Sequence, residues 1–177
     1  PKQVFTLARA WQIAGKKKFP VRSILLSTDY AAPSLMNQIR ETWNCTVLQH
    51  YGMTEAGLGV GIDCAAARGF HMREADLYFE LIDSNGHLVP DGQPGEVVLT
   101  TLTRKGMPLI RYRSKDISRV MYGHCPCGTV LKTYEWIKNR KDDDQSIVTI
   151  QQLDDLIFEQ PGINGFDAAW IGKGLKL

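Results

Sequence analysis

The sequence lacks a long apolar run: no stretch approaches the roughly 20 consecutive apolar residues that a membrane-spanning helix needs. Neither sign of charge dominates, because 21 Lys and Arg stand against 19 Asp and Glu, for a net charge of +2. The charges do not form blocks, so a nucleic-acid-binding surface is not indicated. Hydrophobic residues make up 44% and charged residues 23% of the 177 positions, a composition that excludes a disordered or fibrous chain.

The sequence also lacks an internal repeat, a low-complexity tract and a secretory signal, so we expect a cytoplasmic globular protein. A chain of this length can bury about 70% of its unfolded surface, which suits one domain or one and a half. It begins with Pro1 instead of Met, and we interpret it as a piece of a longer protein. We expect no membrane or nucleic-acid partner, and self-association into a homodimer is left open.

The first 50 residues alternate between helical and strand patterns. Apolar residues at helical spacing predict a helix over 4–11, and Pro33 can open a second helix with an apolar face. Short apolar runs at 23–27 and 46–48 predict buried strands. Helices that alternate with strands are typical of α/β folds, so we expect a parallel-sheet α/β segment here.

From Asp76 onward the hydrophobic period changes to two. Strands are predicted over 77–82, 95–102 and 117–120, with turns between them. We expect a small antiparallel, β-barrel-like subdomain. A charged linker is predicted over 138–145, and a strand over 147–150 followed by a helix face would start a small α+β C-terminal domain.

Four cysteines occur, and without a secretion signal a disulfide framework is a poor expectation. Cys125 and Cys127 flank a tight turn that aims both thiols one way. Cys64 and His71 come just before the first long strand of the β region. Zinc prefers four tetrahedral nitrogen or sulfur ligands, so these four residues predict a closed, structural Cys₃His zinc site, a zinc knuckle.

Alternatives to this metal site stay open at the level of sequence. Cys125 and Cys127 can instead form a reduced surface turn, with Cys64 as a small core residue. His124 can replace His71 as the fourth ligand. Cys45 is expected to be a buried hydrophobic residue.

A second polar group follows the predicted strand at 46–48. Thr54 offers a hydroxyl to a phosphate, Glu55 offers a carboxylate suited to Mg²⁺, and Gly52 lets the backbone approach a ligand closely. Further along, Asp116 can accept hydrogen bonds from two ribose hydroxyls. The alternatives are an ordinary glycine-containing loop and a turn aspartate paired with Lys115 or Arg113.

Four segments resemble, in order, the motifs of the adenylate-forming superfamily of acyl- and aryl-CoA ligases: 51–55, 95–96, 112–116 and 139–142. Segments 100–103, 107–113 and 125–128 resemble the phenylacetate–coenzyme A ligase branch in particular. That branch is similar to this chain also in placing a Cys and a Gly-x-His before the barrel strand, here Cys64 and His71. The resemblance therefore strengthens the expectation of zinc.

The resemblance implies a role for each matching position. Thr54 would contact the α-phosphate of ATP, and Glu55 would hold Mg²⁺. Asp116 would bind the ribose with help from Arg140. The remaining nucleotide-site and hinge positions implied in this way are Thr28 and Asp29 beside the adenine, His50, Tyr51 and Gly52 around the adenine and acyl pockets, and Asp142 at the hinge.

The implied activity is formation of an acyl-AMP from a carboxylic acid, aromatic acids included, followed by transfer to coenzyme A. The implied organisation is the end of a large nucleotide-binding domain over 1–60, the β-barrel-like subdomain over 61–138, and the hinge with part of a mobile domain over 139–177.

The chain also departs from the family pattern. Lys115 and Asn139 stand where the family has glycine, and no Gly- and Ser/Thr-rich phosphate loop or C-terminal catalytic lysine is present. We therefore expect the 177-residue chain by itself not to catalyse adenylation. The alternative function is a non-catalytic, zinc-stabilised relative that binds a nucleotide or a partner protein.

Overall fold

The structure is a computed structural model that describes residues 1–15, 20–57, 59–137, 139–141, 148–160, 162–171 and 174–176. The chain divides into two compact units. The first comprises 1–24, 29–47 and 146–177, and the second comprises 25–28 and 48–145. The domain boundaries expected from the sequence, at 60 and 138, stay a prediction.

Three helices form most of the first unit: α1 (Lys2–Ile13), α2 (Pro33–Trp43) and α3 (Ile150–Ile157). Pro33 occupies the first turn of α2, where its missing N–H costs no hydrogen bond. Thr149 caps α3 in a capping box with Gln152. Phe5 and Phe158 are fully buried and pack edge to face, with ring centroids 5.3 Å apart. The hairpin β10 (Ala169–Ile171) and β11 (Gly174–Lys176) completes this unit.

Strands β1 (Ser23–Leu26) and β2 (Thr46–Tyr51) are neighbours in one sheet. The Thr46 N–H donates to the Arg22 carbonyl at 3.1 Å, and Ser27 Oγ lies 2.9 Å from His50 Nδ1. The contacts advance in the same direction along both strands, as in a parallel pair. These contacts agree with the parallel arrangement predicted for this segment, whereas the sheet as a whole is mostly antiparallel.

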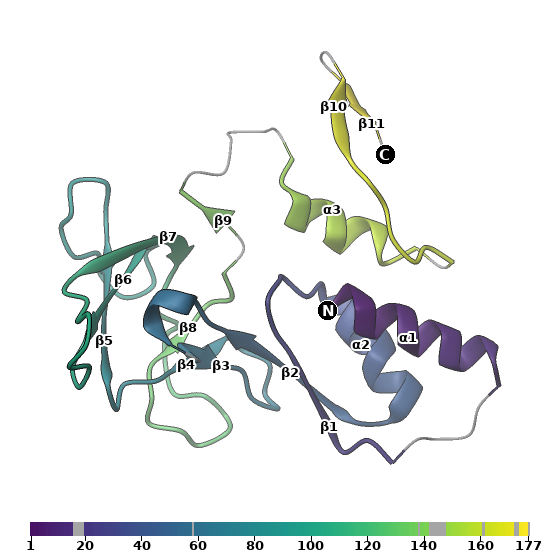
Figure 1. Ribbon diagram of the computed structural model, residues 1–177, viewed down its shortest axis with the longest axis horizontal. Coiled ribbons are helices and arrows are strands. Elements are labelled where there is room, and N and C mark those ends of the chain that lie inside the picture. The colour runs from purple at the N-terminus through teal and green to yellow at the C-terminus, as the bar shows by residue number, and fades with distance from the viewer. Residues whose placement is uncertain are drawn as a thin grey trace. The chain divides into compact units, whose positions relative to one another are not determined.

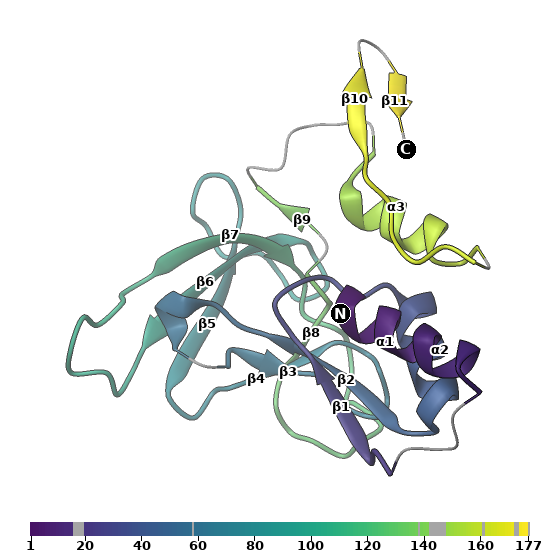
Figure 2. The ribbon, with the colours of Figure 1, turned by 45° about the vertical axis from the view of Figure 1, so that its right-hand side comes forward.

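Antiparallel strands extend this sheet in the order β1-β2-β3-β4-β8 (Figure 1). The added strands are short: β3 (Gly61–Ile62), β4 (Phe70–Met72) and β8 (Thr133–Tyr134). A second, wholly antiparallel sheet has the order β5-β6-β7-β9 and is seen most clearly in Figure 2. Its strands are β5 (Leu77–Ile82), β6 (Gly95–Thr101), β7 (Tyr112–Ser118) and β9 (Asn139–Arg140).

The expectation of a barrel-like subdomain is wrong. Within the described residues neither sheet closes on itself, and β5 and β9 are the two edges of the four-stranded sheet. The reason is that β4 and β8 pair with each other in the other sheet, so the chain changes sheets at 73–76. The unit is instead held by a core between the sheets, including Phe70, Leu77, Leu99 and Tyr134.

Several predicted boundaries also need correction. The strand expected at 117–120 is β7, which begins five residues earlier at Tyr112. The linker predicted over 138–145 contains β9, whereas Lys138 and residues 142–145 lie outside the described residues. Ile150, expected in a strand, is the first residue of α3, because the capping box at Thr149 starts a helix there. Of the expected strand at 147–150, Ile147 lies outside the described residues. None of the helices in the described part of the chain has both the length and the apolar character needed to cross a membrane.

Candidate functional site

Tyr51 and Asp116 form the centre of the candidate nucleotide site. The Tyr51 hydroxyl donates to the Asp116 carboxylate at 2.6 Å, and both residues are buried, at 8% exposure each. Burial, together with the negative charge of Asp116, raises the pKa of Tyr51 far above its usual value, so the hydroxyl keeps its proton. Phe70 stacks on the Tyr51 ring with centroids 5.7 Å apart. Two motifs that lie 65 residues apart in sequence thus share one buried hydrogen bond.

A bulge in β7 places the aspartate. One residue of β6, Val97, faces the three residues 114–116 of β7, because the register shifts between Glu96 and Val98. Lys115 at the middle of the bulge has φ of +67°, which leaves Asp116 buried. Asp116 therefore lies inside strand β7, just before the residues at which the sequence predicted a strand to begin.

Arg140 approaches the same carboxylate from β9. Asp116 and Arg140 are partners in the β7–β9 pair, and Arg140 Nε lies 3.2 Å from Asp116 Oδ1. The Arg140 guanidinium also donates to the Ser114 carbonyl at 3.1 Å. The motif at 139–142 therefore lies beside the motifs at 51–55 and 112–116. One oxygen of Asp116 faces a cation, Arg140, and the other accepts from a hydroxyl, that of Tyr51.

Thr54 and Glu55 lie on the one-turn helix η1 (Thr54–Ala56), directly after β2. Both are exposed, and the Arg104 guanidinium donates to the Glu55 carbonyl. Partial burial raises the pKa of Tyr112, and so does the Glu55 carboxylate, which is a hydrogen-bond partner of the Tyr112 hydroxyl. Tyr112 is on β7, so Glu55 contacts the same strand that carries Asp116.

His50 has a hydrogen-bond partner at one ring nitrogen and a close neighbour at the other. Nδ1 forms the hydrogen bond with Ser27 Oγ. Nε2 faces Gly59 so closely that a Cβ added to Gly59 would lie 2.8 Å from it. Gly52 is exposed.

The remaining implied positions are less central to this group. Thr28 is exposed, with φ of +78°. Asp29 belongs to the first unit, and its carboxylate accepts from the Tyr30 N–H at 2.9 Å. Asp142 lies outside the described residues.

The candidate metal site is a cluster of Cys64, His71, Cys125 and Cys127, whose ligand atoms all lie within 4.8 Å of one another. The sulfurs of Cys64 and Cys125 are 3.6 Å apart, and Cys127 Sγ is 3.4 Å from His71 Nε2. A tetrahedral ion with Zn–S bonds of about 2.3 Å would set its sulfur ligands roughly 3.7 Å apart. The donor atoms therefore fit a zinc ion.

The structure brings His71 and not His124 to this cluster. His71 is buried on β4, whereas His124 is exposed and its carbonyl accepts from Arg68. Burial lowers the pKa of His71, which favours the neutral imidazole that metals bind. Burial and the neighbouring thiols raise the pKa of Cys64 to about 11. Cys45 is half-buried and outside the cluster.

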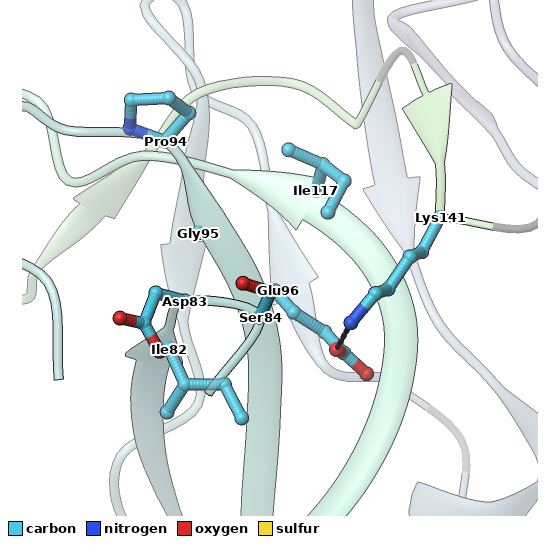
Figure 3. Close-up of a pocket in the computed structure, with 8 residues that line it drawn as sticks. All are labelled: Ile82, Asp83, Ser84, Pro94, Gly95, Glu96, Ile117 and Lys141. Carbon is cyan, nitrogen blue, oxygen red and sulfur yellow. Dashed lines mark hydrogen bonds and ion pairs between the residues drawn. The ribbon is translucent and has the colours of Figure 1, made fainter. Parts of the chain in front are cut away.

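On the four-stranded sheet, Glu96 forms a charged cluster near a shallow pocket. Its carboxylate is 3% exposed and accepts from Arg113, from the Lys115 N–H and from Lys141 Nζ, the last at 3.4 Å. Figure 3 shows Glu96 and Lys141 pointing toward each other at this pocket. Burial alone would raise the pKa of Glu96, but Arg113 and Lys141 together lower it.

Three contacts escaped the sequence analysis. Arg104 at Glu55 carried no sequence signal, because it lies in a turn between strands. Tyr112 was part of a motif without an assigned role. Thr133, which contacts His71 Nδ1 at 3.1 Å, became visible only through the pairing of β4 with β8.

Comparison with solved structures identifies the class of fold. A 2-hydroxyisobutyryl-CoA ligase in the postadenylation state, in complex with 2-HIB-AMP, aligns with a TM-score of 0.81 at 22% identity, over 92% of this chain and 37% of that one. A benzoate CoA ligase from Burkholderia xenovorans LB400 aligns with a TM-score of 0.59 at 17% identity, over 88% of this chain and 34% of that one. The chain thus has the fold of part of an adenylate-forming CoA ligase.

Sequence comparison then narrows the resemblance. No family model matches the chain. The phenylacetate–coenzyme A ligase of Aromatoleum evansii is 36% identical over 118 residues, which are 63% of this chain and 26% of that protein. The enzyme of that name from Thermus thermophilus is 30% identical over 148 residues, or 81% of this chain and 33% of that protein. The predicted resemblance to the phenylacetate–coenzyme A ligase branch is confirmed, and the chain spans about a quarter to a third of these curated relatives.

Proposed function

We propose that the chain forms the adenylate-binding part of an ATP-dependent acyl- or aryl-CoA ligase. The observation that carries the proposal is the meeting of three motifs around one carboxylate, with Tyr51 and Arg140 at the two oxygens of Asp116. A buried carboxylate held on a strand is suited to accept the hydroxyls of a ribose. The similarity to phenylacetate–coenzyme A ligases supports the same function.

In the proposed reaction a carboxylate oxygen of the acid attacks the α-phosphorus of ATP, and pyrophosphate leaves. The sulfur of coenzyme A then attacks the acyl carbon, and AMP leaves. Asp116 would hold the ribose, and Thr54 would donate to an α-phosphate oxygen as charge develops there. Glu55 is exposed and offers a carboxylate for Mg²⁺, which would neutralise phosphate charge when bound. Phenylacetate and benzoate, for which some of these relatives are named, are aromatic acids, so an aromatic carboxylic acid is the proposed class of substrate.

We further propose that the Cys64, His71, Cys125 and Cys127 cluster binds a structural zinc ion. Three thiols and one imidazole form a closed set of four ligands, with no position left for a substrate. The ion would join β4 to the turn at 125–128, so it would stabilise the second unit and take no part in the reaction.

One observation favours the alternative of a non-catalytic nucleotide- or partner-binding relative. Lys115 occupies a left-handed backbone position next to Asp116, where glycine would be unstrained. A lysine at this position is compatible with nucleotide binding, because its backbone keeps the hydrogen bonds of the bulge.

The test of the ligase function is ATP–pyrophosphate exchange, measured on the full-length protein with a panel of aliphatic and aromatic carboxylic acids. Exchange that depends on an acid, and that Asp116→Asn abolishes, would support the ligase. AMP binding without exchange for any acid would favour the non-catalytic relative. For the 177-residue chain alone, we expect AMP binding that Asp116→Asn weakens and no exchange; exchange by this chain would contradict the expectation.

A further inference from the structure

His71 offers its two ring nitrogens to different partners. Nε2 faces the sulfur of Cys127 at 3.4 Å, inside the proposed metal site. Nδ1 faces the hydroxyl oxygen of Thr133 at 3.1 Å, in a buried contact. Thr133 is itself 6% exposed, so water has little access to this side of the ring.

We propose that Thr133 is a positioning residue for the metal site: its hydroxyl fixes the tautomer and the orientation of His71. This inference rests on the proposed zinc site. A metal binds the nitrogen that carries no proton, so a neutral His71 that coordinates through Nε2 carries its proton on Nδ1. The Nδ1–H then donates to Thr133 Oγ1, which is the partner within reach.

The strand register explains why Thr133 is in place. His71 on β4 and Thr133 on β8 are directly paired, and so are Phe70 and Tyr134 next to them. Gly69 allows the two strands to meet this closely, because a Cβ at this position would lie 2.2 Å from the Tyr134 carbonyl oxygen. The hydroxyl is therefore held by the backbone pairing of two strands and not by a flexible loop.

The metal geometry also requires a fixed ring. Cys125 and Cys127 come from one turn and Cys64 from another, whereas His71 is the ligand supplied by a strand. Rotation of the imidazole about its bond to Cβ would move Nε2 away from Cys127. A hydrogen bond at Nδ1 opposes this rotation, and such partners typically change metal affinity by roughly 10–100-fold.

The experiment uses Co²⁺ as the probe, since its thiolate-to-metal absorption reports tetrahedral sulfur ligation directly. Thr133→Val keeps the shape of the side chain and removes the hydroxyl, and Thr133→Ser keeps the hydroxyl. Thr101→Val is the matched control, because Thr101 is a strand threonine with a hydrogen-bonded hydroxyl in the other sheet. Nitrogen-15 NMR of metal-loaded protein adds the tautomer of His71 as a readout independent of affinity.

We expect Thr133→Val to weaken Co²⁺ binding by roughly tenfold or more, with Thr133→Ser and Thr101→Val close to wild type, and the proton of His71 on Nδ1. Wild-type protein that binds no Co²⁺ would overturn the metal site and with it the role of Thr133. Wild-type binding that Thr133→Val leaves unchanged would overturn the role of Thr133 alone. If Thr133→Val does not fold, the NMR spectrum decides: a proton on Nε2 in the metal-loaded wild type refutes the proposal.

Discussion

Tyr51→Phe is a sharp test of the central hydrogen bond, because it removes one oxygen atom and leaves the buried ring in place. The Asp116 side chain is 11% exposed, so water cannot readily replace the lost hydroxyl. A hydrogen bond to a charged group contributes about 1.5–3 kcal/mol, and Arg140 still neutralises the carboxylate from the other side. We therefore expect the free energy of unfolding to fall by about 2 kcal/mol.

Urea denaturation followed by circular dichroism measures this change, and thermal unfolding should show a Tm lower by about 4–8 °C. Tyr78→Phe is the matched control: Tyr78 is 56% exposed, and we expect a change within about 0.5 kcal/mol. A Tyr51→Phe protein as stable as the control would show that the hydroxyl and Asp116 are not joined in solution. The three-motif site would then lose its centre.

Three further predictions concern charge, backbone and metal. Glu96→Gln should cost about 1–2 kcal/mol at pH 7. Because the folded-state pKa of Glu96 is lowered, the wild-type advantage is present above the unfolded value near pH 4.3 and should shrink as the pH falls below it; a deficit independent of pH would contradict this. Lys115→Gly should raise the free energy of unfolding by about 0.5–1 kcal/mol in urea titrations, since glycine relieves the positive φ and keeps both backbone hydrogen bonds; a loss of stability would refute the idea of strain. Chelation of a metal present at a hundred times its Kd should cost about 2.7 kcal/mol, or roughly 5–10 °C in Tm, with hydrogen exchange increased over 60–130; unchanged unfolding would count against the zinc site.

The sequence was most informative where local chemistry decides the structure. Pro33 marks the start of α2, and the alternation of 77–82 matches β5 residue for residue. The three cysteine ligands of the candidate metal site could also be predicted from the sequence, because thiols are typical zinc ligands. The choice between His71 and His124 was not available, since it depends on which histidine the β4–β8 pairing turns inward.

What the sequence could not provide was pairing between distant segments. The prediction of a barrel-like arrangement was wrong because an alternating pattern predicts a strand but not the strand with which it pairs. Strands β4 and β8 belong to the five-stranded sheet that contains β1 and β2. The bulge that places Asp116 was not predicted, because a positive φ at Lys115 has no sequence signature when the residue is not glycine. The roles of the nucleotide-site residues stay predictions.

The first unit is formed by three separate segments of the chain and the second mainly by one, and this difference affects how the protein folds during synthesis. The second unit is built mainly from one continuous stretch, 48–145, so it can acquire its core as soon as that stretch leaves the ribosome. The first unit needs segments that lie far apart in the sequence: Phe5 and Phe158 pack together, and Lys2 forms an ion pair with Asp154 at 2.9 Å. Phe5 on α1 therefore gains this partner only after the segment around Phe158 has been translated, so α1 exposes an apolar side chain to which a chaperone could bind in the meantime.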